Sequence, residues 1–193
     1  MSTPAAPSSA SRVSFAPLTS KNLGTVRKLN SVLFPIKYSE RFYNDILQPE
    51  VEDFCQLVYY NDVPVGNICC RLETNDDGQT KLYLMTMGIL AVSWDRILIC
   101  QRRQQTLRLN PQPYRSRHLG SQSLELVLKA AAAHTKPKIS RIYLHVQVSN
   151  DAAKKFYERH GFKEVGIHQD YYKKIEPRDA WILEREIGDE AVN

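Results

Sequence analysis

The spacing of apolar residues changes along this chain, and the change limits the folds that the chain can adopt. Over residues 23–33 apolar side chains recur every three or four positions, which is the spacing of one helical face. Farther on, apolar runs at 54–60, 63–72 and 81–90 alternate with turn residues such as Asn75-Asp-Asp-Gly78. These features predict a helix that is followed by the three strands of an antiparallel meander.

The second half of the chain alternates between helices and strands. Asn150 is a good helix N-cap, and Gly161 is typical of a helix end. The expected elements are helices at 124–133 and 150–161 and strands at 141–148, 163–168 and 180–187, in addition to an earlier short helix at 39–47. Together with the meander, they predict an α+β fold with a central mixed sheet.

Length and composition indicate one domain with two tails. The chain has 193 residues, and 42% of them are hydrophobic, which is enough for one core. Residues 1–12 are rich in Ser, Ala and Pro and are expected to be a disordered tail, residues 13–187 the domain, and residues 188–193 a second tail. The sequence lacks an apolar run of membrane-spanning length and a secretory signal, so we expect a cytoplasmic or nuclear chain with no membrane partner.

Charge and cysteine content argue against two further classes of protein. The net charge is +5, but residues 92–112 contain four arginines and one aspartate, so the basic excess lies mainly in one segment. That distribution, without an RNA-recognition or helix-turn-helix pattern, argues against a sequence-specific nucleic-acid binder. The four cysteines are irregularly spaced and form no Cys-x-x-Cys or Cys/His pattern, so we expect no metal site.

Two central strands carry the residues of greatest chemical interest. Side chains alternate along a strand, so Tyr83, Met85 and Met87 share one side of their strand. On the second strand, His145 lies on one side with the polar residues two positions away. If the two strands are neighbours, Tyr83 and His145 face one cleft. The alternative is that both are hydrogen-bonded polar groups of an ordinary core.

A glycine-bearing turn, residues 117–122, opens the helix that contains Leu124. The first backbone N–H groups of a helix lack partners and lie at the positive end of the helix dipole, which suits a pyrophosphate. Many helices begin after such a turn and bind nothing, so the turn alone leaves both interpretations open.

Several motifs occur in an order that resembles the GNAT superfamily of N-acetyltransferases, and within it the N-terminal acetyltransferases of the NatE type. They are Arg117-x-x-Gly120, Val32-Leu-Phe-Pro-Ile-Lys-Tyr38, Tyr83-Leu-Met-Thr-Met-Gly88, Ile142-Tyr-Leu-His-Val-Gln-Val-Ser-Asn150, Phe156-Tyr157 with Gly161-Phe162, and Tyr171-Tyr-Lys-Lys-Ile-Glu-Pro177. The resemblance implies the GNAT fold, with a largely antiparallel, mixed seven-stranded sheet and about four flanking helices. It also implies acetyl transfer from acetyl-CoA, without a metal, to a peptide α-amine.

The resemblance implies a role for each matching residue. Tyr83 and His145 are expected to hold a water molecule, and an unperturbed histidine pKa near neutrality suits His145 as the base. Acetyl-CoA is expected to contact Met87, Gly88, Ile89, Arg117, Leu119, Gly120, Gln122, Ser123, Asn150 and Tyr157. Tyr157 would protonate the leaving thiolate, and its alternative role is packing between helix and sheet.

The peptide would bind beside these groups. Phe34, Pro35 and Ile36 resemble the lining of an apolar pocket for an initiator Met that precedes an apolar residue, and the further peptide contacts expected are Met85, Tyr38, Tyr171 and Tyr172. The alternative for Phe34-Pro35 is a core corner at a helix end. Nascent peptide N-termini are the expected substrates, and the NatA complex and the ribosome are the expected partners.

Two other functions stay open at this point. The first is a catalytically weak GNAT-fold subunit that binds the ribosome or an N-terminal acetyltransferase complex. The second is acetylation of lysine side chains. At pH 7 deprotonation costs about 1.4 kcal/mol for an α-amine and about 4.6 kcal/mol for a lysine, so the α-amine is the easier substrate.

The chain departs from the family pattern at two places. The family has Gly or Ala where this chain has Gln122, and a larger side chain there would crowd a pyrophosphate. Residues 92–112 also separate Ala91 from Pro113, where the family continues directly. The segment begins with Val-Ser, which the nucleotides GT-x-AGT would encode, and it ends with Gln, which CAG would encode. Because introns begin with GT and end with AG, we interpret the segment as a translated intron. The alternative is a genuine basic insertion that contacts ribosomal RNA or a protein partner.

Overall fold

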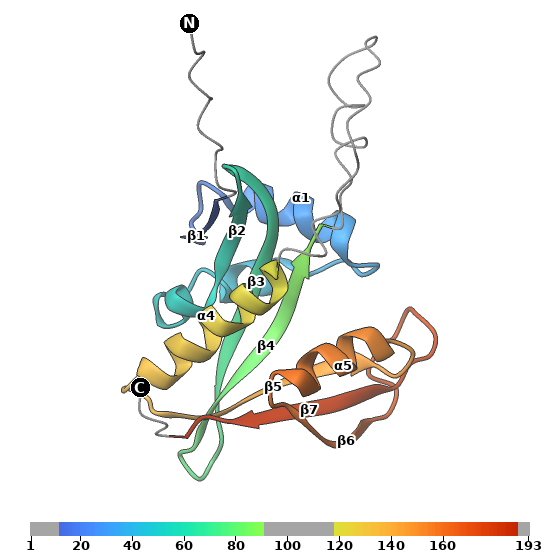
Figure 1. Ribbon diagram of the computed structural model, residues 1–193. Coiled ribbons are helices and arrows are strands. Elements are labelled where there is room, and N and C mark those ends of the chain that lie inside the picture. The colour runs from blue at the N-terminus through green and yellow to red at the C-terminus, as the bar shows by residue number, and fades with distance from the viewer. Residues whose placement is uncertain (1–11, 91–117, 189–193) are drawn as a thin grey trace, which may run out of the picture.

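The computed structural model describes residues 12–90 and 118–188 of the 193-residue chain (Figure 1). Within these residues, seven strands form one sheet in the order β1-β2-β3-β4-β5-β7-β6. The strands are β1 (Val13–Pro17), β2 (Gln56–Tyr60), β3 (Val63–Thr74), β4 (Thr80–Ile89), β5 (Ile139–Gln147), β6 (Lys163–His168) and β7 (Ala180–Glu186). The helices are α1 (Leu23–Leu33), α2 (Glu40–Asp45), α4 (Leu119–Ala133) and α5 (Asp151–Arg159), and η1 (Pro49–Phe54) is a 3-10 helix.

The elements expected from the spacing of apolar residues are all present, and two more occur. The edge strand β1 has only five residues, too few to show a clear alternation, and η1 begins with Pro49 and shows no apolar period. The helix α4 begins at Leu119 and not near Leu124, because Leu119 is the only large apolar residue of residues 119–123 and one such residue shows no period. With η1, the described residues contain five helical segments, where about four were expected.

Several expected features fall wholly or partly outside the described residues. They are residues 1–11 of the first tail, the segment 92–112, Arg117 and residues 189–193. At the boundary of the first tail, the backbone N–H of Arg12 donates to Asn61 Oδ1 at 2.9 Å. In the ranges 12–90 and 118–188, no helix combines the length and apolar character needed to cross a membrane.

The parallel strands β4 and β5 pair along only part of their length. Their pairing runs from Thr80 and Ile139 to Tyr83 and Tyr143. Beyond that last pair, β4 continues to Ile89 beside β3, while β5 continues to Gln147 beside β7. Figure 1 shows the green strand β4 diverging from the orange strand β5. The divergence opens the centre of the sheet at one end.

Buried polar residues hold α1 against this open end. The amide of Asn67 in β3 donates to Asn30 Oδ1 in α1 at 2.9 Å, and the Thr86 hydroxyl of β4 donates to Asn67 Oδ1 at 3.4 Å. These three side chains are almost completely buried, so the bonds between them form without competition from solvent. They fix the end of α1, and the Phe34 that follows it, over Gly88 at the end of β4.

Candidate active site

A cavity of about 610 Å³ lies where β4 and β5 diverge. Most of the residues predicted to bind the peptide or the acyl end of acetyl-CoA line it: Phe34, Pro35, Ile36, Tyr38, Tyr83, Met85, Met87, His145, Asn150, Tyr157, Tyr171 and Tyr172. They come from the segment after α1, from both diverging strands, from α5 and its N-cap, and from the loop between β6 and β7. The fold therefore collects into one cavity residues that are distant in the sequence.

The other predicted contacts of acetyl-CoA that belong to the described residues lie outside this cavity. Gly88 and Ile89 occupy the end of β4, whereas Leu119, Gly120, Gln122 and Ser123 belong to the first turns of α4. The first helical hydrogen bond of α4 joins the Gln122 N–H to the His118 carbonyl at 2.9 Å. The backbone N–H groups that precede Gln122 thus have no helical acceptor and can bind an anion.

Two observations describe the surroundings of this turn. Ser123 is fully buried, and its hydroxyl finds no hydrogen-bond partner among the described residues. A Cβ atom added to Gly120 would lie 3.5 Å from the Phe156 ring, so the first turn of α4 lies beside α5, which follows the cavity-lining Asn150. The side chain of Gln122 is exposed and points away from the buried face of α4.

Tyr83 and His145 interact directly inside the cavity. The Tyr83 hydroxyl lies 3.2 Å from His145 Nδ1 and 2.5 Å from the hydroxyl of Tyr171. The His145 ring also stacks on the Tyr171 ring, with centroids 4.2 Å apart. The sequence predicted that Tyr83 and His145 face one cleft if their strands are neighbours, and β4 and β5 are neighbours. The structure adds Tyr171 as a group that contacts both side chains.

The electrostatics of the pair determine the direction of the hydrogen bond. Burial, followed by the neighbouring Tyr171, raises the pKa of Tyr83 far above its usual range, so the phenol stays protonated. Burial, followed by repulsion from His168, lowers the pKa of His145 to about 4. The pKa of His145 in the fold thus lies below the unperturbed value near neutrality that suits a histidine base. At pH 7 the imidazole is neutral, and it can accept the proton of the Tyr83 hydroxyl.

Asn150 and Tyr157 combine structural and cavity positions. Asn150 Oδ1 accepts a hydrogen bond from the Ala153 N–H at 3.1 Å and so caps α5. Tyr157 packs edge-on against Phe156 and Phe162, which agrees with the packing role considered for it. Burial raises the pKa of Tyr157, so its hydroxyl remains a proton donor in the cavity wall.

The apolar part of the cavity is built by the segment after α1. Leu33, Phe34, Pro35 and Ile36 line it, and Tyr38 closes its side by stacking on Phe42 with centroids 4.3 Å apart. The Phe34 ring meets Tyr38 edge-on at 6.0 Å. Since these side chains carry few polar atoms, this wall of the cavity is apolar.

Sequence reasoning missed several residues that support the site. Tyr143 stacks under Tyr83 at 4.7 Å and donates a hydrogen bond to Glu73, which in turn pairs with Arg71. Tyr143 could have been found, because it lies two positions before His145 on the same side of β5. Glu73 and Arg71 carried no such signal, because their positions depend on the register between β3 and β4.

Another missed residue is His168, the last residue of β6. Its Nδ1 lies 3.4 Å from His145 Nε2. Its own strand shows no motif that marks it, so only the order of the strands brings it to His145. Within 12–90 and 118–188, no three His, Cys, Asp or Glu side chains are close enough together to hold a metal ion.

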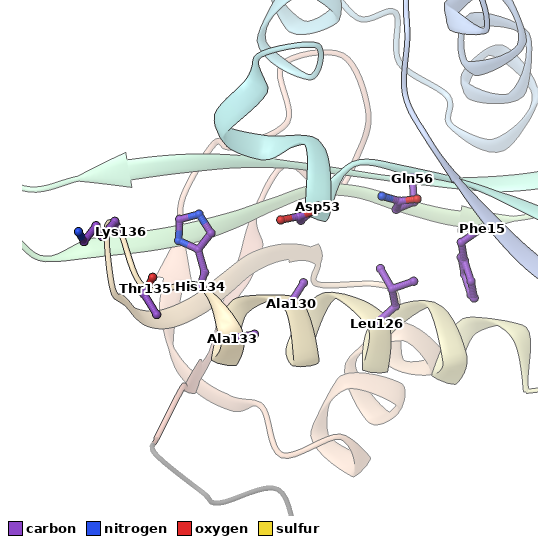
Figure 2. Close-up of a pocket in the computed structure, with 9 residues that line it drawn as sticks. All are labelled: Phe15, Asp53, Gln56, Leu126, Ala130, Ala133, His134, Thr135 and Lys136. Atoms are coloured by element: carbon purple, nitrogen blue, oxygen red, sulfur yellow. The ribbon is translucent and has the colours of Figure 1, made fainter.

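A separate cavity of about 640 Å³ lies between α4 and the η1–β2 region (Figure 2). Leu126, Ala130 and Ala133 form its helical side, and Asp53 and Gln56 lie across from them. It shares no lining residue with the cavity between β4 and β5. Because Tyr83 and His145 line the cavity between β4 and β5, we treat that cavity as the candidate active site.

Comparison with known proteins identifies the family. The model of the acetyltransferase (GNAT) family matches residues 23–162. The chain belongs to the GNAT acetyltransferase family. This GNAT chain is 35% identical to N-alpha-acetyltransferase 50 of Danio rerio over 176 residues, which cover 91% of this chain and 89% of the zebrafish protein. It is 34% identical to the probable N-acetyltransferase san of Drosophila melanogaster, over 95% of this chain and 85% of that protein.

Solved structures share the GNAT fold of the chain. The structure of Arabidopsis thaliana Naa50 in complex with the bisubstrate analogue CoA-Ac-MVNAL has a TM-score of 0.71 and 37% sequence identity, and the match covers 90% of this chain and 97% of that one. The NatC complex bound to Gag peptide and CoA matches with a TM-score of 0.70 but only 17% identity, over 91% of this chain and 99% of that one. That second match shows the fold alone.

Proposed function

We propose that this GNAT chain transfers the acetyl group of acetyl-CoA to the α-amine of peptides that begin with Met followed by an apolar residue. The observation that carries the proposal is the Tyr83–His145 pair, which lies in one cavity with the apolar wall formed by Phe34, Pro35 and Ile36. The relative from zebrafish is named N-alpha-acetyltransferase 50, and the analogue in the Arabidopsis complex carries a peptide that begins with Met and Val. Both support the proposed substrate.

The reaction begins with removal of a proton from the peptide ammonium group. The neutral His145 can accept a hydrogen bond from the Tyr83 hydroxyl. A proton that leaves the amine can therefore pass to His145 through this hydroxyl or through a bridging water. The free amine then forms the new N–C bond with the thioester carbonyl, and the C–S bond breaks. The nitrogen loses two protons in total, of which one reaches solvent and the other ends on the sulfur of CoA.

The leaving thiolate needs a proton donor within the cavity. Tyr157 lines the cavity and keeps its proton because burial raises its pKa. We assign to Tyr157 the protonation of the CoA sulfur, and the second proton that the amine nitrogen loses then returns to the Tyr157 oxygen. We assign to the open N–H groups of the first turn of α4 the binding of the pyrophosphate.

The geometry favours the α-amine over the two alternative functions. A lysine side chain needs about 3 kcal/mol more than an α-amine for deprotonation at pH 7, and His145 with a pKa of about 4 is a weak base. A subunit that only binds would need no aligned pair of Tyr83 and His145, yet the structure holds their atoms 3.2 Å apart. An easily deprotonated α-amine is the substrate that this pair can serve.

We further propose that nascent peptide N-termini in the cytoplasm are the substrates and that the NatA complex and the ribosome are the partners. The motifs shared with NatE-type enzymes support this assignment. Recovery of NatA subunits or ribosomes with the tagged full chain, decreasing as salt increases, is the expected result. Absence of both at low salt would contradict the partnership.

An acetylation assay tests the proposed function. The purified chain is mixed with acetyl-CoA and, in separate reactions, with one of three peptides. The first peptide begins with Met-Leu and the second with Ser-Leu, and the third is a Met-Leu peptide with a blocked N-terminus and an internal lysine. We expect the Met-Leu peptide to be acetylated on its α-amine at least tenfold faster than the other two peptides. Faster reaction of the blocked lysine peptide would overturn the proposal. The same assay on a chain without residues 92–112 reports whether that segment influences turnover.

A further inference from the structure

His168 extends the hydrogen-bonded pair of the active site toward solvent. It is the last residue of β6 and pairs with Ala180 of β7, and its side chain is exposed. Its Nδ1 lies 3.4 Å from His145 Nε2, and the centroids of the two rings are 5.3 Å apart. The active-site imidazole thus contacts a second, exposed imidazole on the next strand but one.

Both ring nitrogens of His145 face protein groups. Nδ1 faces the Tyr83 hydroxyl at 3.2 Å and Nε2 faces His168. One face of the His145 ring is covered by Tyr171, at a centroid distance of 4.2 Å. A proton that enters His145 from the cavity through Nδ1 is therefore matched by a proton that leaves through Nε2, and the group that faces Nε2 is His168.

We propose that His168 receives the proton removed from the peptide amine and releases it to solvent. This inference rests on the proposed acetyl transfer to an α-amine. The ammonium proton moves to the Tyr83 oxygen, the Tyr83 hydroxyl proton moves to His145 Nδ1, the His145 Nε2 proton moves to His168 Nδ1, and the His168 Nε2 proton moves to bulk water. Each group gains one proton and loses one, and the net change is one proton in solvent.

The groups around His168 are consistent with this role. It faces His145 from β5, and the Tyr171 ring from the β6–β7 loop lies 5.2 Å from its own ring. Glu73 is the acidic group whose charge acts on His145. Repulsion between the two imidazoles lowers the pKa of His145, so a proton on His168 discourages a second proton on His145. His168 is the exposed group of the pair.

A structural role for His168 predicts different behaviour. An exposed residue at the end of an edge strand contributes little to packing, and its replacement is expected to change stability only slightly. A proton carrier, in contrast, can be replaced by a small base from solution, because the site of the lost imidazole is open to solvent. Rescue of turnover by added imidazole is the signature that a packing residue cannot produce.

The experiment compares wild type, His168→Ala, His168→Gln and the matched control His134→Ala in weakly buffered solution with saturating acetyl-CoA. We expect kcat of both His168 variants to fall by roughly tenfold, below the 10²-fold or larger loss of a directly acting acid–base group, with an unchanged KM for the Met-Leu peptide. Added imidazole at tens of millimolar should restore kcat of His168→Ala, whereas sodium chloride of equal ionic strength should not. His134→Ala lies outside the active-site cavity and should match wild type throughout.

The outcomes separate this inference from the proposed function. A wild-type chain that does not acetylate the Met-Leu peptide overturns the proposed function and the proton path with it. An active wild type with unchanged kcat in both His168 variants overturns the path through His168 alone. A reduced kcat that imidazole does not restore also overturns it, because the loss would then reflect structure and not proton transfer. Only a reduced kcat with an unchanged KM and imidazole rescue supports it.

Discussion

The Tyr83 hydroxyl lies 3.2 Å from His145 Nδ1, although 62 positions separate the two residues in the chain. The parallel register pairs Tyr83 with Tyr143, and this is the last pair before β4 and β5 diverge. His145 therefore lies two residues beyond the point where the backbone pairing between β4 and β5 ends. The side chains meet across a gap that a substrate can enter, while the paired strands below hold their positions.

Replacing Tyr83 with phenylalanine tests this relationship. The variant keeps a ring that can stack on Tyr143 at 4.7 Å but lacks the hydroxyl that faces His145. We expect kcat for a Met-Leu peptide to fall by about 10²-fold, with a small change in peptide KM. The control Tyr59→Phe, on β2, should keep full activity. Full activity of Tyr83→Phe in a steady-state assay would contradict the proposed proton transfer.

The lowered pKa of His145 predicts how stability depends on pH. An unfolded histidine binds a proton below pH 6.5, whereas the folded His145, with a pKa of about 4, does not, so the free energy of unfolding falls as the pH decreases from 6.5 to 4. Because the side chain is half-buried, we expect a loss of only about 1–2 kcal/mol. The variant His145→Gln should lose less stability over that interval in urea titrations at pH 7 and pH 5. Equal losses in both proteins would argue against the burial effect.

Gly88 lies directly against the apolar wall of the cavity, and its lack of a side chain leaves room for Phe34 and Leu33. A Cβ atom there would lie 2.9 Å from Phe34 Cζ and 3.1 Å from Leu33 Cδ1. We expect Gly88→Ala to displace Phe34, destabilise the protein by about 1–2 kcal/mol and raise the peptide KM several-fold. The control Gly24→Ala, in α1, meets nothing within 4 Å and should be neutral or stabilising by up to about 1 kcal/mol. Thermal unfolding and peptide kinetics measure both effects, and similar behaviour of the two variants would be inconsistent with the close contact.

Ile36 is expected to contribute to selection of the first peptide residue. Its side chain lines the apolar part of the cavity. Ile36→Ala should lower kcat/KM for a Met-Leu peptide by roughly tenfold, because a few lost methyl and methylene contacts correspond to about 1–3 kcal/mol. The control Val32→Ala removes a side chain that is 63% exposed on α1 and should leave kcat/KM unchanged. If Ile36→Ala retains wild-type selectivity between Met-Leu and Ser-Leu peptides, the pocket assignment is wrong.

Gln122 departs from the small residue of the family but is exposed in the first turns of α4. Exposed substitutions usually change a free energy by less than about 0.5 kcal/mol, so we expect Gln122→Ala to change the Kd for CoA about twofold at most. Calorimetric titration of wild type and variant with CoA measures this. An increase in affinity of tenfold or more in Gln122→Ala would show that the glutamine crowds the pyrophosphate.

Local patterns in the sequence were sufficient to predict most helices and strands and the side of each strand on which Tyr83 and His145 lie. The period of apolar residues reports which face of an element is buried, and this information is contained in neighbouring residues. The motifs around Gly120 and Asn150 also predicted residues that the structure places at the start of α4 and in the cavity wall. The same local information missed β1, which is too short to show a period.

Tertiary structure alone decided which of these residues meet. Tyr171 and His168 reach His145 because β6 and β7 extend the sheet beyond β5, and Glu73 reaches Tyr143 because β3 pairs with β4 in one register. Such contacts join residues tens of positions apart and depend on strand order and register, which no short segment encodes. The same holds for the pKa of His145, because the lowering comes from burial and from a neighbour that only the folded sheet provides. The sequence by itself thus determined the elements and the chemical groups, whereas the paired strands decided their geometry and their charge.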